Sequence, residues 1–167
     1  HHPEAQDLYK LEFEYPSNWA WNRANQPIAQ YDDCLSTADP TKSDYGLNEE
    51  PNFEQGLIMV WVLQIDPASF TASTFIDELL ARIHQNLYLD LRTDDMIDVD
   101  GYSARRIVYR TAPRPGPMNQ VPLLEEYIFV TVGDRYYEFS LSIPESERLD
   151  PYGLAFDHLI ESVHFLP

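Results

Sequence analysis

Cysteine is nearly absent from this sequence, which contains only Cys34. A single cysteine excludes an intrachain disulfide, so cysteine usage does not reveal whether the protein matures in an oxidising compartment. Asp32 and Asp33 precede Cys34, and their negative charges disfavour the thiolate that a nucleophilic cysteine needs. Cys34 is therefore a poor candidate for a catalytic residue.

Long apolar segments are also missing. The longest run, from Leu57 to Leu63, is far shorter than the roughly 20 residues that a membrane-spanning helix needs. The chain opens on His1-His2-Pro3 and not on methionine, so we expect an end that is either processed or artificially chosen, with any signal segment upstream not seen. The sequence predicts no direct insertion of this domain into a membrane.

Basic residues are scarce. Eleven lysines and arginines face 28 aspartates and glutamates, which gives a formal net charge of -17 at pH 7. Such a surface repels phosphate backbones and anionic lipid headgroups, so we expect neither nucleic acid nor an acidic membrane as partner. Metal cations or basic patches of another protein fit the charge better, and solubility alone also explains it.

Familiar catalytic motifs are absent as well. No glycine-rich phosphate loop occurs, and the residues around Ser103 lack the closing glycine of a nucleophile elbow. His158 and Glu161 have a helical spacing that can hold zinc, but no second ligand pair accompanies them. We therefore expect a protein that is not an enzyme. An enzyme whose site assembles from residues scattered along the chain stays open as an alternative.

The apolar content is sufficient for a core. Hydrophobic residues make up 44% of the 167 residues and aromatics 13%, which predicts one folded domain over 1–167. Two segments inside it have no regular pattern. Residues 32–56 are rich in acids and predict a long acidic loop, and residues 112–122 predict a stiff, Pro-rich loop.

Two hairpins are predicted in the second half of the chain. Asp100-Gly101 and Gly133-Asp134 are two-residue turn signals, and each lies between segments of strand-like composition. The predicted strands are about 93–99, 102–111, 123–132 and 135–143. Pairing through the turns places Asp95 opposite Arg106, Ile97 opposite Ala104, Val99 opposite Tyr102, Val130 opposite Tyr137, Ile128 opposite Phe139 and Leu124 opposite Ile143.

Three further strands are expected earlier in the chain. Leu11, Phe13 and Tyr15 alternate with glutamates and predict a half-buried strand. A weaker pattern suggests a strand at 27–31, and the apolar run 57–65 predicts a strand near the middle of the sheet.

Two amphipathic helices complete the pattern. Thr74 and Asp77 resemble a capping box, with Ser73 as an alternative cap, and predict a helix over 74–88. Asp150-Pro151 opens the second helix. The residues expected to be buried are Phe75, Ile76, Leu79, Leu80, Ile83 and Leu87 in the first helix, and Leu154, Phe156, Leu159, Ile160 and Val163 in the second. The fold class is therefore α+β, a mainly antiparallel sheet of about six to seven strands sandwiched by helices.

Four stretches together resemble the PsbP-like domains: FEYPSNW at 13–19, DVDGYSA at 98–104, YYEF at 136–139, and the closing segment 156–165. These domains include the photosystem-associated PsbP proteins and bacterial DcrB-type lipoproteins, and they share their fold with the Ran-binding Mog protein. The resemblance implies a periplasmic, cell-surface or thylakoid-lumen location, often with a lipid tether upstream. It also implies accessory or binding roles with a protein partner.

Clustered carboxylates at 94–100 are the candidate metal site. Asp94, Asp98 and Asp100 surround a turn, and oxygen ligands of this kind suit a divalent cation such as calcium. A calcium-type binding module is therefore the alternative function, although no cofactor is firmly implied. Turn formation alone also explains the Asp-Gly pair.

Aromatic residues near the predicted loops are the candidate interaction site. Trp21, Tyr31 and Tyr45 lie in such segments, and aromatic side chains are enriched at interface hot spots. The leading hypothesis is a non-enzymatic, extracytoplasmic binding domain that contacts a protein partner through its loops.

Overall fold

A computed structural model describes residues 9–15, 22–23, 33–36, 57–65, 71–113, 121–145 and 151–167, without the side chains of 22–23, 33–36, 57 and 151. The elements are β1 (Leu11–Glu12), β2 (Asn22–Arg23), β3 (Asp33–Ser36), β4 (Leu57–Gln64), α2 (Ala72–Gln85), β5 (Leu89–Val99), β6 (Tyr102–Thr111), β7 (Leu123–Val132), β8 (Arg135–Pro144), α3 (Pro151–Ser162) and β9 (His164–Phe165). No helix in these ranges has the length and hydropathy to cross a membrane.

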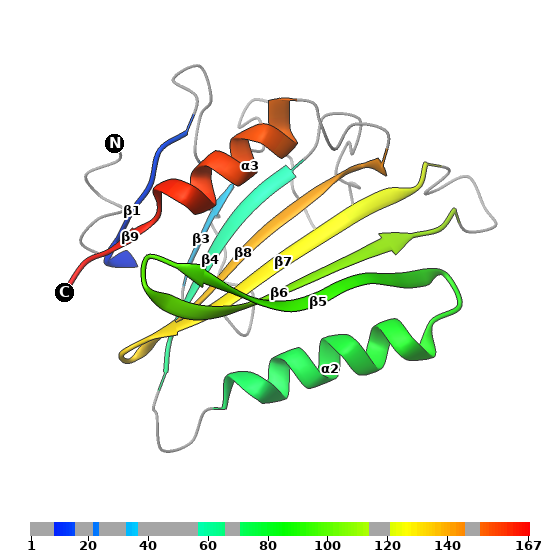
Figure 1. Cartoon of the computed structure of the whole chain (residues 1–167), viewed down its shortest axis with the longest axis horizontal. Coiled ribbons are helices and arrows are strands. Elements are labelled where there is room, and N and C mark those ends of the chain that lie inside the picture. The colour runs from blue at the N-terminus through cyan, green and yellow to red at the C-terminus, as the bar shows by residue number, and fades with distance from the viewer. Residues whose placement is uncertain are drawn as a thin grey trace.

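A seven-stranded antiparallel sheet forms the middle layer, in the order β2-β3-β4-β8-β7-β6-β5. Helices α2 and α3 lie on opposite sides of it (Figure 1). Strands β1 and β9 pair beside α3 as a small second sheet. The predicted α+β sandwich is confirmed. Strand β8 lies in the middle of the sheet, between β4 and β7.

The main core lies between the sheet and α3. Phe156 and Leu159 of α3 pack with Phe139 and Leu141 of β8, and all four are almost fully buried. Burial of each such side chain contributes roughly 1.5–3 kcal/mol. In the same layer, the Tyr137 hydroxyl donates a hydrogen bond of 2.6 Å to the backbone oxygen of Tyr9, which connects the N-terminal segment to the central strand.

A second, smaller core lies under α2. Ile76, Leu79 and Ile83 recur at helical spacing and pack against Ile107 and Phe129 of the sheet. The amphipathic pattern of the sequence therefore predicts the buried side of this helix correctly, because its period matches the turn of the helix.

Both predicted hairpins form with the predicted register. Asp100 and Gly101 have φ of 51° and 80°, the left-handed pair that a tight two-residue hairpin turn requires. Strand β5 begins at Leu89, earlier than the predicted 93, and its register shifts between Leu91 and Thr93. A bulge adds one residue to the strand, so the side chains before it point to the opposite face from the one that the alternation over 93–99 predicts.

Helix α2 differs from its prediction at both ends. Its N-cap is Thr71, so the predicted cap Thr74 and the alternative Ser73 both lie inside the helix. The Thr71 hydroxyl lies 2.8 Å from that of Thr74. The helix ends at Gln85 because Asn86 adopts an extended conformation. Leu87 therefore leaves the apolar stripe and is 99% exposed, and its predicted burial is wrong.

The predicted first strand and the predicted buried side of α3 are each correct only in part. Only Leu11–Glu12 of the predicted first strand is a strand, although Phe13 and Tyr15 still pack against the core. Leu154 of α3 is 58% exposed, against its predicted burial, because it lies on the solvent side of the helix.

The two predicted loops are described only in part. Residues 33–36 of the predicted 32–56 loop form β3, which pairs with β4. This pairing is non-local, so the local acidic composition does not predict it. The predicted strand at 27–31 lies outside the described residues, as do residues 114–120 of the Pro-rich loop.

Candidate functional site

The central strand β8 carries polar side chains on the side of the sheet that faces α2. Glu138, Ser140 and Ser142 alternate with apolar residues that belong to the α3 core. All three are nearly buried, with 8%, 3% and 6% of their surface exposed. Polar groups buried in a central strand cost free energy unless they find partners, so they mark a place where function can outweigh stability.

Strand β7 adds a second row to the same side. Its register places Glu125 opposite Ser142 and Tyr127 opposite Ser140. The Ser142 hydroxyl donates a hydrogen bond of 3.0 Å to Oε1 of Glu125. We call Glu125, Tyr127, Glu138, Ser140 and Ser142 the polar patch.

Aromatic rings border the polar patch. Tyr109, Tyr127, Phe129 and Tyr136 stack in sequence, with neighbouring ring centroids 5.9, 5.9 and 6.0 Å apart. Phe129 and Tyr136 also belong to the core under α2. On β4, Trp61 is paired with Glu138 and is buried. The patch therefore lies in an aromatic, low-dielectric setting.

Burial changes the acidity of these groups. Desolvation raises the pKa of Glu125 from 4.5 to about 7, against the hydrogen bond from Ser142 and the positive charge of Arg82, which both lower it. Desolvation and the nearby Glu125 raise the pKa of Tyr109 to about 12. Desolvation also holds the pKa of Tyr127 well above its usual range. Of Glu125, Tyr109 and Tyr127, Glu125 is therefore the group that exchanges a proton near neutral pH.

Sequence reasoning missed the polar patch. The signal was present as the alternation Glu138-x-Ser140-x-Ser142 in a predicted strand. The residues that alternate with them form part of the α3 core and give the strand its clear apolar face: Tyr137, Phe139 and Leu141. Alternating polar residues normally indicate a solvated face, whereas here Glu138, Ser140 and Ser142 are nearly buried and Tyr127 packs in the core under α2.

An open groove lies at the C-terminal end of α2. Its described lining consists of Glu78, Ala81, Arg82, Gln85, Asn86, Leu87 and Tyr88. Leu87 is 99% exposed and Tyr88 is 37% exposed, which places two large apolar side chains at the rim. The groove thus combines polar walls with an apolar rim.

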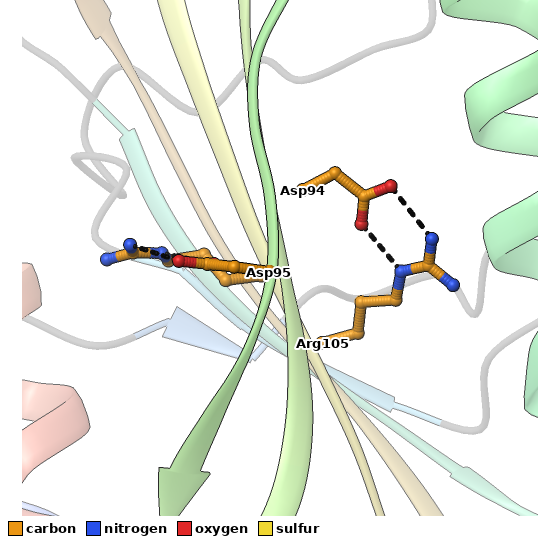
Figure 2. Close-up of polar contacts among 4 residues, drawn as sticks. Asp94, Asp95 and Arg105 are labelled. Carbon is orange, nitrogen blue, oxygen red and sulfur yellow. Dashed lines mark hydrogen bonds and ion pairs between the residues drawn. The ribbon is translucent and has the colours of Figure 1, made fainter.

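The predicted metal ligand Asp94 is occupied by an arginine. Its two carboxylate oxygens accept hydrogen bonds of 2.7 and 2.8 Å from Arg105. Figure 2 shows this pair on one side of the hairpin and Asp95 on the other, where Asp95 pairs with Arg106. Hydrogen bonding to Arg105 lowers the pKa of Asp94, so the carboxylate stays ionised and paired.

The other two predicted ligands also have protein partners, that of Asp98 within the hairpin turn and those of Asp100 in β9. Asp98 accepts a hydrogen bond of 3.0 Å from the backbone nitrogen of Gly101. Asp100 accepts one of 2.8 Å from the backbone nitrogen of Phe165, and its Oδ1 lies 3.2 Å from Nδ1 of His164. In the part of the chain that the structure describes, no group of three or more His, Cys, Asp or Glu residues is placed to hold a metal ion. Metal binding at 94–100 stays a prediction.

The remaining candidates do not form a site with one another. His158 lies 2.9 Å from Glu14, on another segment, and Glu161 takes no part in that contact. Among the described residues, no serine hydroxyl is hydrogen-bonded to a histidine. Trp21, Tyr31 and Tyr45 lie outside the described residues.

Neither a protein-family model nor a curated protein matches the sequence. Solved structures do match. LpqN of Mycobacterium tuberculosis, involved in cell envelope biogenesis, is 12% identical with a TM-score of 0.58, covering 94% of this chain and 83% of LpqN. Cyanobacterial PsbP of Synechocystis is 19% identical with a TM-score of 0.57, covering 95% and 89%. This chain has the PsbP-like fold.

The PsbP-like fold extends to a third comparison. The Ran-binding protein Mog1p of Saccharomyces cerevisiae is 11% identical with a TM-score of 0.52, covering 95% of this chain and 93% of Mog1p. Such low identities establish the fold and no more, because one fold hosts many functions. The predicted resemblance is confirmed at the level of the PsbP-like fold, and function has to be argued from the residues.

Proposed function

We propose that this PsbP-like domain is a non-enzymatic, extracytoplasmic accessory domain that binds another protein. The observation that carries the proposal is the rim of the α2 groove, where Leu87 and Tyr88 expose apolar surface side by side. An aromatic and an aliphatic side chain next to a groove form the kind of anchor around which protein interfaces are built.

The charge of the chain indicates the kind of partner. With a formal net charge of -17, the domain attracts basic surfaces over long range and accelerates encounter with them. The partner is therefore a protein with a basic patch around an apolar pocket. Leu87 fills the pocket, and Glu78 at the groove meets the basic patch.

The comparisons support the binding role and the location by analogy. Mog1p is described as Ran-binding and LpqN as involved in cell envelope biogenesis.

The test compares two substitutions of equal chemistry. The tagged domain is cross-linked in the cells that produce it, and the partner is identified by mass spectrometry. The purified partner is then titrated against the wild type, Leu87→Asp and Leu154→Asp to measure its affinity for each. Both leucines are exposed and they lie in different parts of the fold, Leu87 in the turn after α2 and Leu154 within α3. We expect Leu87→Asp to weaken binding about tenfold or more, and Leu154→Asp to leave it unchanged.

Equal affinity of the wild type and Leu87→Asp would rule out this surface. Trp21, Tyr31 and Tyr45 are sequence-based candidates for the same role, so Trp21→Ser, Tyr31→Ser and Tyr45→Ser belong in the same titration. A loss confined to these variants would move the interface to the loops.

A further inference from the structure

We propose that the polar patch is a binding site for a small organic cation, whose ammonium or guanidinium group is held by Glu125 and Ser140 against the surrounding aromatic rings. The inference goes beyond the protein-binding proposal and does not depend on it. It rests on hydrogen bonding, charge and the aromatic setting on the α2 side of β7 and β8.

Ser140 provides the first observation. Its hydroxyl is buried and has no hydrogen-bond partner, and only 3% of the residue is exposed. Buried hydroxyls almost always find a partner, because leaving one unsatisfied costs stability. Ser140 projects from the same side of β8 as Glu138 and Ser142, so its hydroxyl belongs to the patch and can accept a hydrogen bond from a ligand N–H.

Glu125 provides the second, independent observation. Its carboxyl accepts one hydrogen bond, from Ser142, although an ionised carboxylate has about four acceptor sites. Arg82 acts on it through its charge without forming an ion pair. A half-buried carboxylate in this state is short of positive charge and of donors, and an ammonium or guanidinium group supplies both.

The aromatic border favours an organic cation over a metal ion. The charges of both Glu125 and Glu138 act on Tyr127, so the ring of Tyr127 lies near both carboxyl groups. Trp61 and Phe129 flank Glu138 in the register of the sheet. Ring faces attract organic cations, whereas a hard metal ion needs several oxygen ligands that converge on one point. No such group of acidic and histidine side chains occurs among the described residues.

Binding is linked to the protonation of Glu125. The titratable and charged groups that interact with Glu125 are Arg82 of α2, Tyr109 of β6 and Tyr127 of its own strand, and Glu138 of β8 acts on Tyr127. Because burial raises the pKa of Glu125 to about 7, its carboxyl must lose a proton before it can hold a cation. Affinity should therefore rise about tenfold per pH unit below pH 7 and level off above it.

Agmatine, which carries both cationic groups, and butylammonium serve as probes, with butanol as the neutral control. Binding is measured by calorimetry at pH 6 and pH 8 with the wild type, Glu125→Gln, Ser140→Ala and the exposed-site control Glu161→Gln. We expect agmatine or butylammonium to bind more tightly at pH 8 than at pH 6. Glu125→Gln should lose about tenfold in affinity at pH 8 and lose the pH dependence. Ser140→Ala should also bind more weakly, and Glu161→Gln should match the wild type.

Three results would overturn the inference. The first is that neither cation binds at pH 8. The second is that butanol binds as tightly as butylammonium, which would indicate an apolar pocket. The third is that Glu125→Gln and Ser140→Ala both bind like the wild type while remaining folded by circular dichroism. None of these results bears on the partner titration with Leu87→Asp, so the two proposals can fail separately.

Discussion

Replacement of Glu125 by glutamine should stabilise the protein at alkaline pH. Glutamine keeps the size of the side chain and removes the charge that burial penalises. The pKa of Glu125 rises from 4.5 to about 7 on folding, a difference of about 2.5 units. At about 1.36 kcal/mol per unit, the ionised side chain costs the folded state about 3 kcal/mol at pH 8.

The sign of the pH dependence follows from where each state ionises. Below pH 4.5 the carboxyl of Glu125 is protonated in both states, so it contributes no penalty. Between pH 4.5 and about 7 the unfolded chain releases the proton and the folded chain keeps it, so the free energy of unfolding falls as pH rises. Above about pH 7 the loss is complete. Since glutamine does not titrate, the advantage of Glu125→Gln grows over this window.

Urea unfolding at pH 5, 6, 7 and 8 measures this advantage, followed by far-UV circular dichroism. The many other acids also change stability with pH, so the relevant quantity is the difference between variant and wild type at each pH. Glu161→Gln makes the same chemical change at an exposed position of α3 and serves as the control. A Glu125→Gln difference that stays constant from pH 5 to pH 8 would refute the assigned burial of this carboxyl.

Three further predictions concern the scaffold and the metal candidates. Tyr137→Phe removes the buried hydrogen bond to the backbone oxygen of Tyr9 and should lower the free energy of unfolding by about 1–3 kcal/mol. The control Tyr102→Phe, at an exposed ring, should change it little. Equal effects of the two variants in urea unfolding would contradict the stabilising role of the Tyr137 hydrogen bond. Gly101→Ala should cost about 1–2 kcal/mol because φ there is 80°, even though no atom lies within 4 Å of the added carbon, and an unchanged urea midpoint would show that the turn relaxes. A cation that binds the folded state specifically would raise the free energy of unfolding by about 2.7 kcal/mol at a hundred times its dissociation constant. Because Asp94, Asp98 and Asp100 already have protein partners, we expect no selective rise in Tm with calcium, magnesium, manganese or zinc. A selective rise that Asp98→Ala abolishes would restore the cation site.

Local signals in the sequence determined much of the fold. The Asp100-Gly101 turn and the alternation beside it set the register of the first hairpin, because a slip of one residue would send every apolar side chain to the wrong face. The second hairpin followed in the same way from Gly133-Asp134. The helical stripe of Ile76, Leu79 and Ile83 was equally readable, since periodicity is a property of the segment itself.

Only the tertiary structure decided which features of the sequence became a site. The register of the second hairpin already placed Glu125 opposite Ser142, but no local pattern told whether that face meets solvent or another layer. Tyr127 of the patch packs in the core under α2, and desolvation in the folded chain, which sequence spacing does not report, raises the pKa of Glu125. The pairing of β3 with β4 likewise joins segments that are distant in the sequence. Sequence patterns report what each segment prefers, whereas desolvation and charge at a site depend on which segments pack together.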